Sequence, residues 1–195
     1  MTKSAAPKMN KKALLREESI GRLTQAAFRL IVAKGYHACT LQDIAEAAGL
    51  TKGAIFFYFE SKENLLLQLL DIAEAHIVDP LIEHLDEKRG TAPEKIASFF
   101  RFTSKQGIDR PHELLCLIKM SIESRTGTDI ADRRVSEIYE RIYGMLEVIV
   151  DRGKASGELP RSLPTREFAT LVVATHDGMM LEWHRRGGGI DGRLF

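Results

Sequence analysis

The sequence has little cysteine and no long hydrophobic run. Only Cys39 and Cys116 are present among 195 residues, too few for a disulfide framework, and their spacing suits no zinc site. No stretch approaches the roughly 18 apolar residues of a membrane-spanning helix, and the N-terminus has no apolar segment typical of a signal peptide. We therefore expect a soluble, cytoplasmic protein with no membrane partner and two inert thiols.

The sequence also lacks the motifs of common enzymes. It contains no G-x-S-x-G, no H-E-x-x-H, no P-loop and no pair of carboxylates in a distinctive context. His112 and Cys116 are four residues apart, as two metal ligands on a helix could be, but no third ligand accompanies them. The sequence thus predicts a protein that is not an enzyme, binds no metal and needs no cofactor.

Charge is nearly balanced overall but unevenly distributed. The formal net charge is +1, yet residues 1–62 carry ten Lys or Arg against five Asp or Glu, whereas residues 63–195 carry 18 against 22. A basic N-terminal part is typical of proteins that bind nucleic acid. The acidic remainder predicts a second part with another task, and argues mildly against a strongly anionic ligand there.

Three helix starts follow one another within the basic part. Thr40 precedes Asp43 by three residues, which is close to a capping box, and Gly49 ends that helix. Thr51 can cap a second short helix, and Ser61 can cap a third. Two short helices joined by a glycine turn predict a helix-turn-helix.

Two lysines lie in the first turns of these helices. Lys52 follows the Thr51 cap and Lys62 follows the Ser61 cap, so each faces the positive end of a helix dipole, which costs about 0.3 to 1 kcal/mol. A phosphate would compensate both, because it pairs with the lysine and accepts the unpaired N–H groups of the turn. Solvated lysines are the alternative, but residues 49–59 contain no Asp or Glu, which favours DNA contact.

The rest of the chain has helical periodicity. It shows no convincing alternation of apolar and polar residues of the kind that is typical of strands. We expect an all-α protein with a basic disordered arm over 1–12, a three-helix DNA-binding domain over 13–61, and a helical effector-binding and dimerisation domain over 62–195. A long helix from Lys62 toward Asp79 is expected to kink or end at Pro80. Further helices are predicted at 94–108, 111–125, 129–155 and 165–186.

These residues carry a resemblance to a known family. The chain resembles the tetracycline-repressor (TetR) family of bacterial transcription regulators. The matching positions are Ala27-Phe28, Gly35-Tyr36, Thr40, Ile44-Ala45, Ala48-Gly49-Leu50-Thr51, Gly53, Ile55-Phe56, Tyr58-Phe59, Ser61-Lys62-Glu63 and Leu65. One departure is Phe56, where the family commonly has a tyrosine whose hydroxyl contacts a phosphate. The resemblance implies a divergent helical ligand domain and a dimer formed by the last two helices.

The DNA-contacting residues are predicted from caps, charges and exposed positions. Gly53 costs a helix close to 1 kcal/mol relative to alanine, so it suggests that DNA approaches the backbone there. Phe57 can contact a thymine methyl group, and Lys52 can pair with guanine or phosphate. The predicted DNA-binding residues are Thr40, Gln42, Thr51, Lys52, Gly53, Phe57, Tyr58 and Lys62. The lysines of the arm could reach a minor groove, although a solvated tail is the commoner role.

Two further sets of residues are predicted in the acidic part. Aromatic, Met, Cys and His side chains suit the wall of a cavity for an apolar or amphipathic effector, although ordinary core packing is the commoner role for any one of them. The predicted effector residues are Phe99, Phe102, Cys116, Met120, His176 and Trp183. A broad apolar stripe on helix 165–186 predicts a homodimer interface. Its residues are Phe168, Leu171, Val172, Thr175, Gly178 and Met179.

Together these features predict a ligand-responsive transcriptional repressor. It would bind double-stranded palindromic DNA as a homodimer and leave it when a small-molecule effector binds. An activator or architectural protein without an effector is the alternative, as is an enzyme or carrier with a DNA-binding domain, for which the sequence shows no active-site residues.

Overall fold

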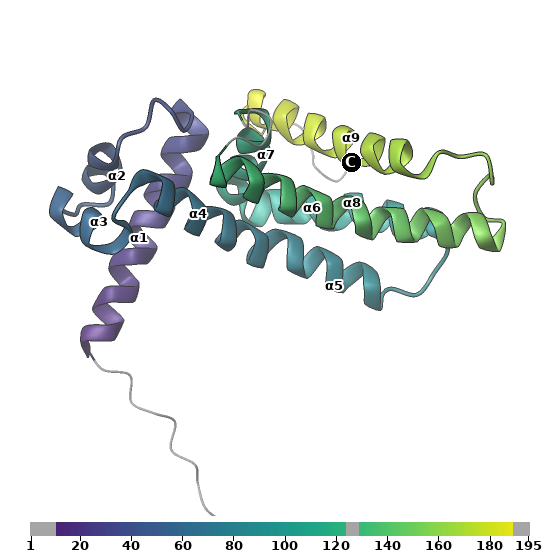
Figure 1. Cartoon of the computed structure of the whole chain (residues 1–195), viewed down its shortest axis with the longest axis horizontal. Coiled ribbons are helices and arrows are strands. Elements are labelled where there is room, and N and C mark those ends of the chain that lie inside the picture. The colour runs from purple at the N-terminus through teal and green to yellow at the C-terminus, as the bar shows by residue number, and fades with distance from the viewer. Residues whose placement is uncertain (1–10, 124–128, 189–195) are drawn as a thin grey trace, which may run out of the picture. The chain divides into compact units, whose positions relative to one another are not determined.

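The computed structural model describes residues 11–123 and 129–188, and within these ranges the only regular structure is helical. The all-α prediction is thus confirmed. The chain divides into two compact units, the first ending at Leu65 and the second beginning at Leu66 (Figure 1). Residues 1–10, which make up most of the predicted arm, lie outside the described ranges.

Three helices form the N-terminal unit. They are α1 (Lys11–Lys34), α2 (Leu41–Ala47) and α3 (Lys52–Phe59). Helix α1 packs on α2 and α2 packs on α3, around a core that includes Leu23, Phe28, Ile31, Ile44, Ile55 and Phe59. Because α1 begins at Lys11, Lys11 and Lys12 belong to a helix and not to the arm.

The helical path does not end at Pro80, which was one of the two expected outcomes there. Helix α4 (Lys62–Ala73) continues into a π-helical turn, η1 (Glu74–Val78), and then into α5 (Asp79–Glu87), where Pro80 occupies the first turn. Proline has no N–H, so a regular helix would leave the carbonyl of His76 without its donor. The Nε2 atom of Gln106 donates to the carbonyl oxygens of His76 at 3.3 Å and Ile77 at 2.9 Å, and this side chain lets the helix run on.

The remaining helices of the C-terminal unit follow the predicted positions closely. They are α6 (Ala92–Asp109), α7 (Pro111–Glu123), α8 (Ile130–Ser156) and α9 (Thr165–Arg185). Thr91 and Glu94 form a complete capping box at the start of α6, and Asp129 caps α8. Helices α8 and α9 are antiparallel neighbours joined by the turn over 157–164 (Figure 1).

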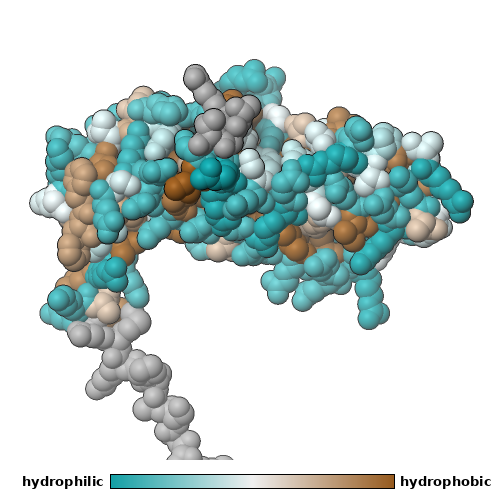
Figure 2. Space-filling view, in the orientation of Figure 1, coloured by the Kyte–Doolittle hydropathy of each residue, from teal (hydrophilic) through white to brown (hydrophobic). Residues whose placement is uncertain are grey.

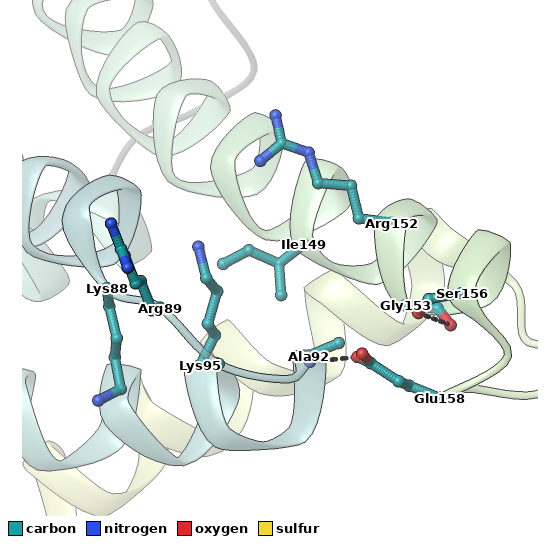
Figure 3. A pocket seen from close by; sticks show the side chains of 10 residues that line it. Lys88, Arg89, Ala92, Lys95, Ile149, Arg152, Gly153, Ser156 and Glu158 are labelled. Carbon is teal, nitrogen blue, oxygen red and sulfur yellow. Dashed lines mark hydrogen bonds between the residues drawn. The ribbon is translucent and has the colours of Figure 1, made fainter.

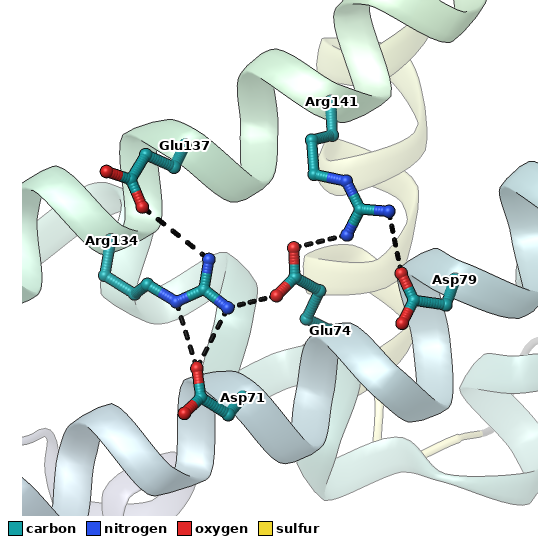
Figure 4. Close-up of polar contacts among 6 residues, drawn as sticks. All are labelled: Asp71, Glu74, Asp79, Arg134, Glu137 and Arg141. Atoms are coloured by element: carbon teal, nitrogen blue, oxygen red, sulfur yellow. Dashed lines mark hydrogen bonds and ion pairs between the residues drawn. The ribbon is translucent and has the colours of Figure 1, made fainter.

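An ion-pair network joins α8 to the π-helical turn (Figure 4). Glu74 accepts hydrogen bonds from both Arg134 and Arg141, while Arg134 also binds Asp71 at 2.9 Å and Arg141 binds Asp79 at 2.8 Å. Burial raises the pKa of Glu74, but the hydrogen bonds from Arg141 and Arg134 outweigh it and leave this pKa lowered. The irregular turn is therefore fixed to α8 by charge as well as by apolar packing.

Hydrophilic residues cover most of the face shown in Figure 2, with hydrophobic residues in small patches between them. Among the described residues, no helix is long and apolar enough to cross a membrane.

Candidate nucleic-acid interface and ligand cavity

Both predicted N-caps of the helix-turn-helix are present. The Thr40 hydroxyl accepts from the Asp43 N–H at 3.1 Å, and the Asp43 carboxylate accepts from the Thr40 N–H at 3.0 Å. The backbone hydrogen bond from Thr40 lowers the pKa of Asp43. At α3, the Thr51 hydroxyl accepts from the Ala54 N–H at 3.2 Å. These caps fix the starts of the two helices that a DNA-binding unit of this kind presents.

The turn between α2 and α3 depends on Gly49 and on a residue of α1. Gly49 has φ +65°, and the Leu50 N–H donates to the Ala45 carbonyl at 2.8 Å. Nη2 of Arg22 donates to the carbonyl of Ala48 at 2.6 Å and to that of Gly49 at 3.3 Å. A Cβ at position 49 would lie 2.8 Å from this nitrogen. Sequence analysis missed Arg22, because 26 residues separate it from the carbonyl it binds.

Helix α3 presents an exposed surface without acidic residues. Thr51, Lys52 and Gly53 are exposed at its N-terminus, and Phe57 is 78% exposed. Gly53 has no positive φ, and a Cβ there would meet only the Thr51 hydroxyl at 3.9 Å. Nothing within the described protein therefore requires glycine at position 53.

The other predicted DNA residues already have contacts in the protein. Lys62 is half-buried, with Nζ 4.2 Å from the centroid of the Tyr36 ring and 3.4 Å from the His37 carbonyl oxygen. Tyr58 is half-buried and packs edge-on against Phe57. The exposed Gln42 donates to Glu46 at 3.0 Å. The ammonium group of Lys62 is thus held in place by contacts within its own unit.

Helix α9 separates the predicted dimer residues onto two sides. Leu171 is 60% exposed, Thr175 and Gly178 are exposed, and Phe168 and Met179 are half-buried. Val172 is only 5% exposed and packs inside the unit, so its placement on an outward stripe is wrong. A Cβ at Gly178 would meet nothing within 4 Å, so packing within the described chain does not require this glycine.

A mostly apolar cavity lies inside the C-terminal unit. Its wall comes from η1, α5, α6, α7, α8 and α9, and includes Ile77, Leu81, Phe99, Leu114, Ile118, Tyr139, Ile142, Val173, His176 and Asp177. The space open to the centre of a water molecule is about 20 Å³. That is room for about one or two waters, so a larger ligand requires the helices to move.

Three polar side chains that contact one another in series border this cavity. Nδ1 of His176 lies 3.0 Å from Oδ1 of Asp177, whose Oδ2 accepts from the Tyr139 hydroxyl at 2.9 Å. Burial, followed by the charge of Asp177, raises the pKa of Tyr139. Nε2 of His176 is buried, with no hydrogen-bond partner among the described residues. It is the polar atom that a ligand in this cavity would satisfy.

Of the six predicted effector residues, Phe99 and His176 line this cavity and the other four do not. Phe102 stacks on the ring of His84 with centroids 4.5 Å apart. Cys116 and Met120 are buried in α7, and burial raises the pKa of the Cys116 thiol to about 12. Trp183 is half-buried near the end of α9.

The fold and the capped, exposed α3 define a protein with a helix-turn-helix DNA-binding unit. Residues 23–69 match the model of a family described as bacterial regulatory proteins, tetR family. The chain belongs to the TetR family of transcriptional regulators, a family that is not enzymatic.

Relatives match along most of the chain. The crystal structure of the MbdR regulator from Azoarcus sp. CIB is 35% identical, with a TM-score of 0.81 over 90% of this chain and 91% of that one. The fatty acid metabolism regulator protein of Bacillus subtilis (strain 168) is 28% identical over 83% of this chain and 81% of that protein. FadR of Bacillus subtilis, solved in complex with stearoyl-CoA, is 26% identical, with a TM-score of 0.72 over 88% of this chain and 90% of that one.

Proposed function

We propose that this protein is a ligand-responsive repressor that binds a palindromic operator as a homodimer and releases it when a small apolar or amphipathic effector binds. Membership of the TetR family supports transcriptional regulation and DNA binding. The observation that carries the DNA contact is the exposed N-terminus of α3, where Lys52 adjoins a glycine that the fold itself does not require.

In this proposal α3 enters the major groove. Lys52 and Phe57 contact base edges, and Gly53 allows the backbone to approach. Thr40, Gln42, Thr51, Tyr58 and Lys62 contact the phosphate backbone and the edge of the groove. Lys62 suits a phosphate because its ammonium group is already held beside Tyr36 at the start of α4.

The dimer in this proposal forms through the exposed side of α9. Leu171, Thr175 and Gly178 form its centre, and Phe168 and Met179 form its margin. A two-fold axis would bring this surface against its own copy, with Gly178 allowing close contact between helices. Two α3 helices would then meet half-sites about 34 to 36 Å apart or at a multiple of that distance.

The effector in this proposal enters the apolar cavity and hydrogen-bonds Nε2 of His176. An apolar body would contact Phe99, Ile118 and Val173, which suits an amphipathic molecule such as a fatty acyl compound. The FadR relative bound to stearoyl-CoA supports this class. Since the cavity is nearly closed, the effector would favour an expanded form, and release of DNA requires that this form bind the operator more weakly.

Operator release tests the proposal. Fluorescence anisotropy of labelled operator DNA would be followed while stearoyl-CoA and shorter acyl compounds are added. We expect release by wild type and a concentration requirement at least tenfold higher for His176→Phe, because this variant keeps an aromatic ring but cannot form the hydrogen bond. Phe102→Leu, whose side chain does not line the cavity, is the matched control. Release that is equal in all three proteins would place the effector elsewhere.

A further inference from the structure

A basic groove lies at the loop between α5 and α6. Its volume is about 400 Å³, and its walls come from the end of α5, the following loop, the start of α6 and the last turns of α8. The groove is lined by four cationic residues, Lys88, Arg89, Lys95 and Arg152, and by one acidic residue, Glu158. This charge contrasts with the C-terminal part as a whole, where acids outnumber bases by 22 to 18 over residues 63–195.

Three of the cations share one side of the groove. Figure 3 shows Arg89, Lys95 and Arg152 extending in the same direction, whereas Lys88 extends the other way. The apolar side chain of Ile149 lies between Lys95 and Arg152 in this view. The arrangement thus places separated positive charges around a residue that is itself largely buried.

The walls of the groove are fixed in place. Nζ of Lys95 donates to the Leu85 carbonyl at 2.8 Å, and the Glu158 carboxylate accepts from the Ala92 N–H at 2.6 Å. Gly90 has φ +137° and the capping box of Thr91 follows it, so the loop that carries Arg89 has a defined conformation. The Glu158 carboxylate is therefore hydrogen-bonded to the start of α6 and does not pair with a cation of the groove.

Among the described residues of the unit, most arginines outside this groove pair with a carboxylate, and the exposed Arg101, Arg133 and Arg161 are the exceptions. Arg110, Arg134, Arg141, Arg166, Arg185 and Arg186 each pair with a carboxylate. Arg89 and Arg152 have no ion pair with any carboxylate of the described residues. What sets Arg89 and Arg152 apart is that they line one concave space together with Lys95, an arrangement that suits an anion.

We propose that this groove binds a phosphorylated small molecule of about mononucleotide size. A guanidinium group can donate two parallel hydrogen bonds to the oxygens of one phosphate. Cations that lie apart favour a ligand with two or more phosphate charges over a single carboxylate. The volume is within the usual range of small-molecule sites. This site is separate from the apolar cavity and does not depend on the operator-release mechanism.

Calorimetric titration of the full-length protein tests the groove directly. The probes are adenosine diphosphate and inorganic pyrophosphate, each at 0.05 M and 0.15 M salt. The test variant is Arg89→Ser with Arg152→Ser. The control is Arg101→Ser with Arg133→Ser, which removes the same charge from two exposed positions that do not line the groove.

Wild type and the control should bind adenosine diphosphate, and the groove variant should bind it at least tenfold more weakly with an unchanged melting temperature. Tighter binding of the nucleotide than of pyrophosphate would show that the nucleoside portion also contacts the groove. Absence of binding to wild type at millimolar concentration, or equal losses in both double variants, would overturn the proposal.

Two sources of the phosphates can be separated by further titrations. Coenzyme A without an acyl chain carries the same nucleotide chemistry as a free nucleotide. If coenzyme A and adenosine diphosphate both depend on Arg89 and Arg152, the groove recognises the nucleotide itself. If only stearoyl-CoA binds, and the groove variant binds it as well as wild type, the groove contributes no phosphate contact and the inference is wrong. Because these titrations contain no DNA, failure of operator release leaves their interpretation unchanged.

Discussion

Arg22 of α1 holds the end of α2 through a 2.6 Å hydrogen bond from Nη2 to the carbonyl oxygen of Ala48. This contact holds the turn that precedes α3. The two glycines of this region, Gly49 and Gly53, have different structural roles. Gly49 is favoured by its positive φ, and a Cβ there would displace the end of the Arg22 side chain, whereas Gly53 has neither a positive φ nor a close neighbour.

Removing the Arg22 side chain should loosen the turn. We expect Arg22→Met to lower the free energy of unfolding by about 1 kcal/mol, because the contact is charge-assisted but partly exposed. Urea unfolding measures this loss. Arg29→Met, at an exposed position of the same helix, is the control and should change stability by less than about 0.5 kcal/mol. Equal stability of the Arg22 and Arg29 variants would show that the hydrogen bond does not hold the turn.

Two phenylalanines of α3 should separate binding from folding. Phe57 is 78% exposed and Phe59 is 3% exposed. Phe57→Ala should leave the urea midpoint nearly unchanged and weaken operator binding, whereas Phe59→Ala should cost about 3 to 5 kcal/mol of stability. An operator affinity equal to that of wild type in the Phe57 variant would remove this residue from the proposed DNA contact.

Adjacent residues of α9 should separate dimerisation from core packing. Leu171→Arg places a charge on an exposed position, so the variant should fold with native helicity and sediment as a monomer at micromolar concentration. Val172→Arg buries an unpaired charge and should unfold or precipitate. If the Leu171 variant remains a dimer by sedimentation, the α9 surface is not the interface.

Glu60 has an unfavourable backbone conformation at the end of α3. It is the non-glycine residue with a positive φ in the described part of the chain, at φ +61°. Glycine avoids this strain but loses more entropy on folding, so Glu60→Gly should raise stability by up to about 1 kcal/mol. Glu60→Ala, which lacks the charge but keeps a Cβ, separates backbone relief from electrostatics. A stabilisation that is equal in both variants would contradict the strain argument.

Local signals in the sequence predicted most of the helices. Thr40, Thr51 and Ser61 act through residues three positions away, so their caps can be recognised without knowledge of the tertiary structure. Pro80 was misjudged because the donor that compensates for it, Gln106, comes from another helix. The role of Arg22 was not predicted for the same reason, because the carbonyl that it binds is distant in the sequence.

The candidate sites were less predictable than the helices. Periodicity placed Val172 and Leu171 on one broad stripe, but only the packing of α9 shows that one is buried and the other exposed. The effector residues were chosen by type, and type does not reveal which of them border one cavity. The C-terminal part has a net negative charge, and this gave no sign of the basic groove. Net charge is a sum over the whole part, whereas the groove depends on which residues lie close together in the fold.

Selection of DNA from a random pool by the full-length protein tests the central claim most directly. The account predicts enrichment of an inverted repeat whose half-sites are one helical turn, or a multiple of it, apart. It further predicts that Lys52→Ala relaxes preference at particular base pairs, while Lys62→Ala weakens binding to all sequences and reduces the salt slope by about one unit. Recovery of unrelated sequences without a repeat, or the same enriched sequence with the same affinity for wild type and both lysine variants, would contradict it.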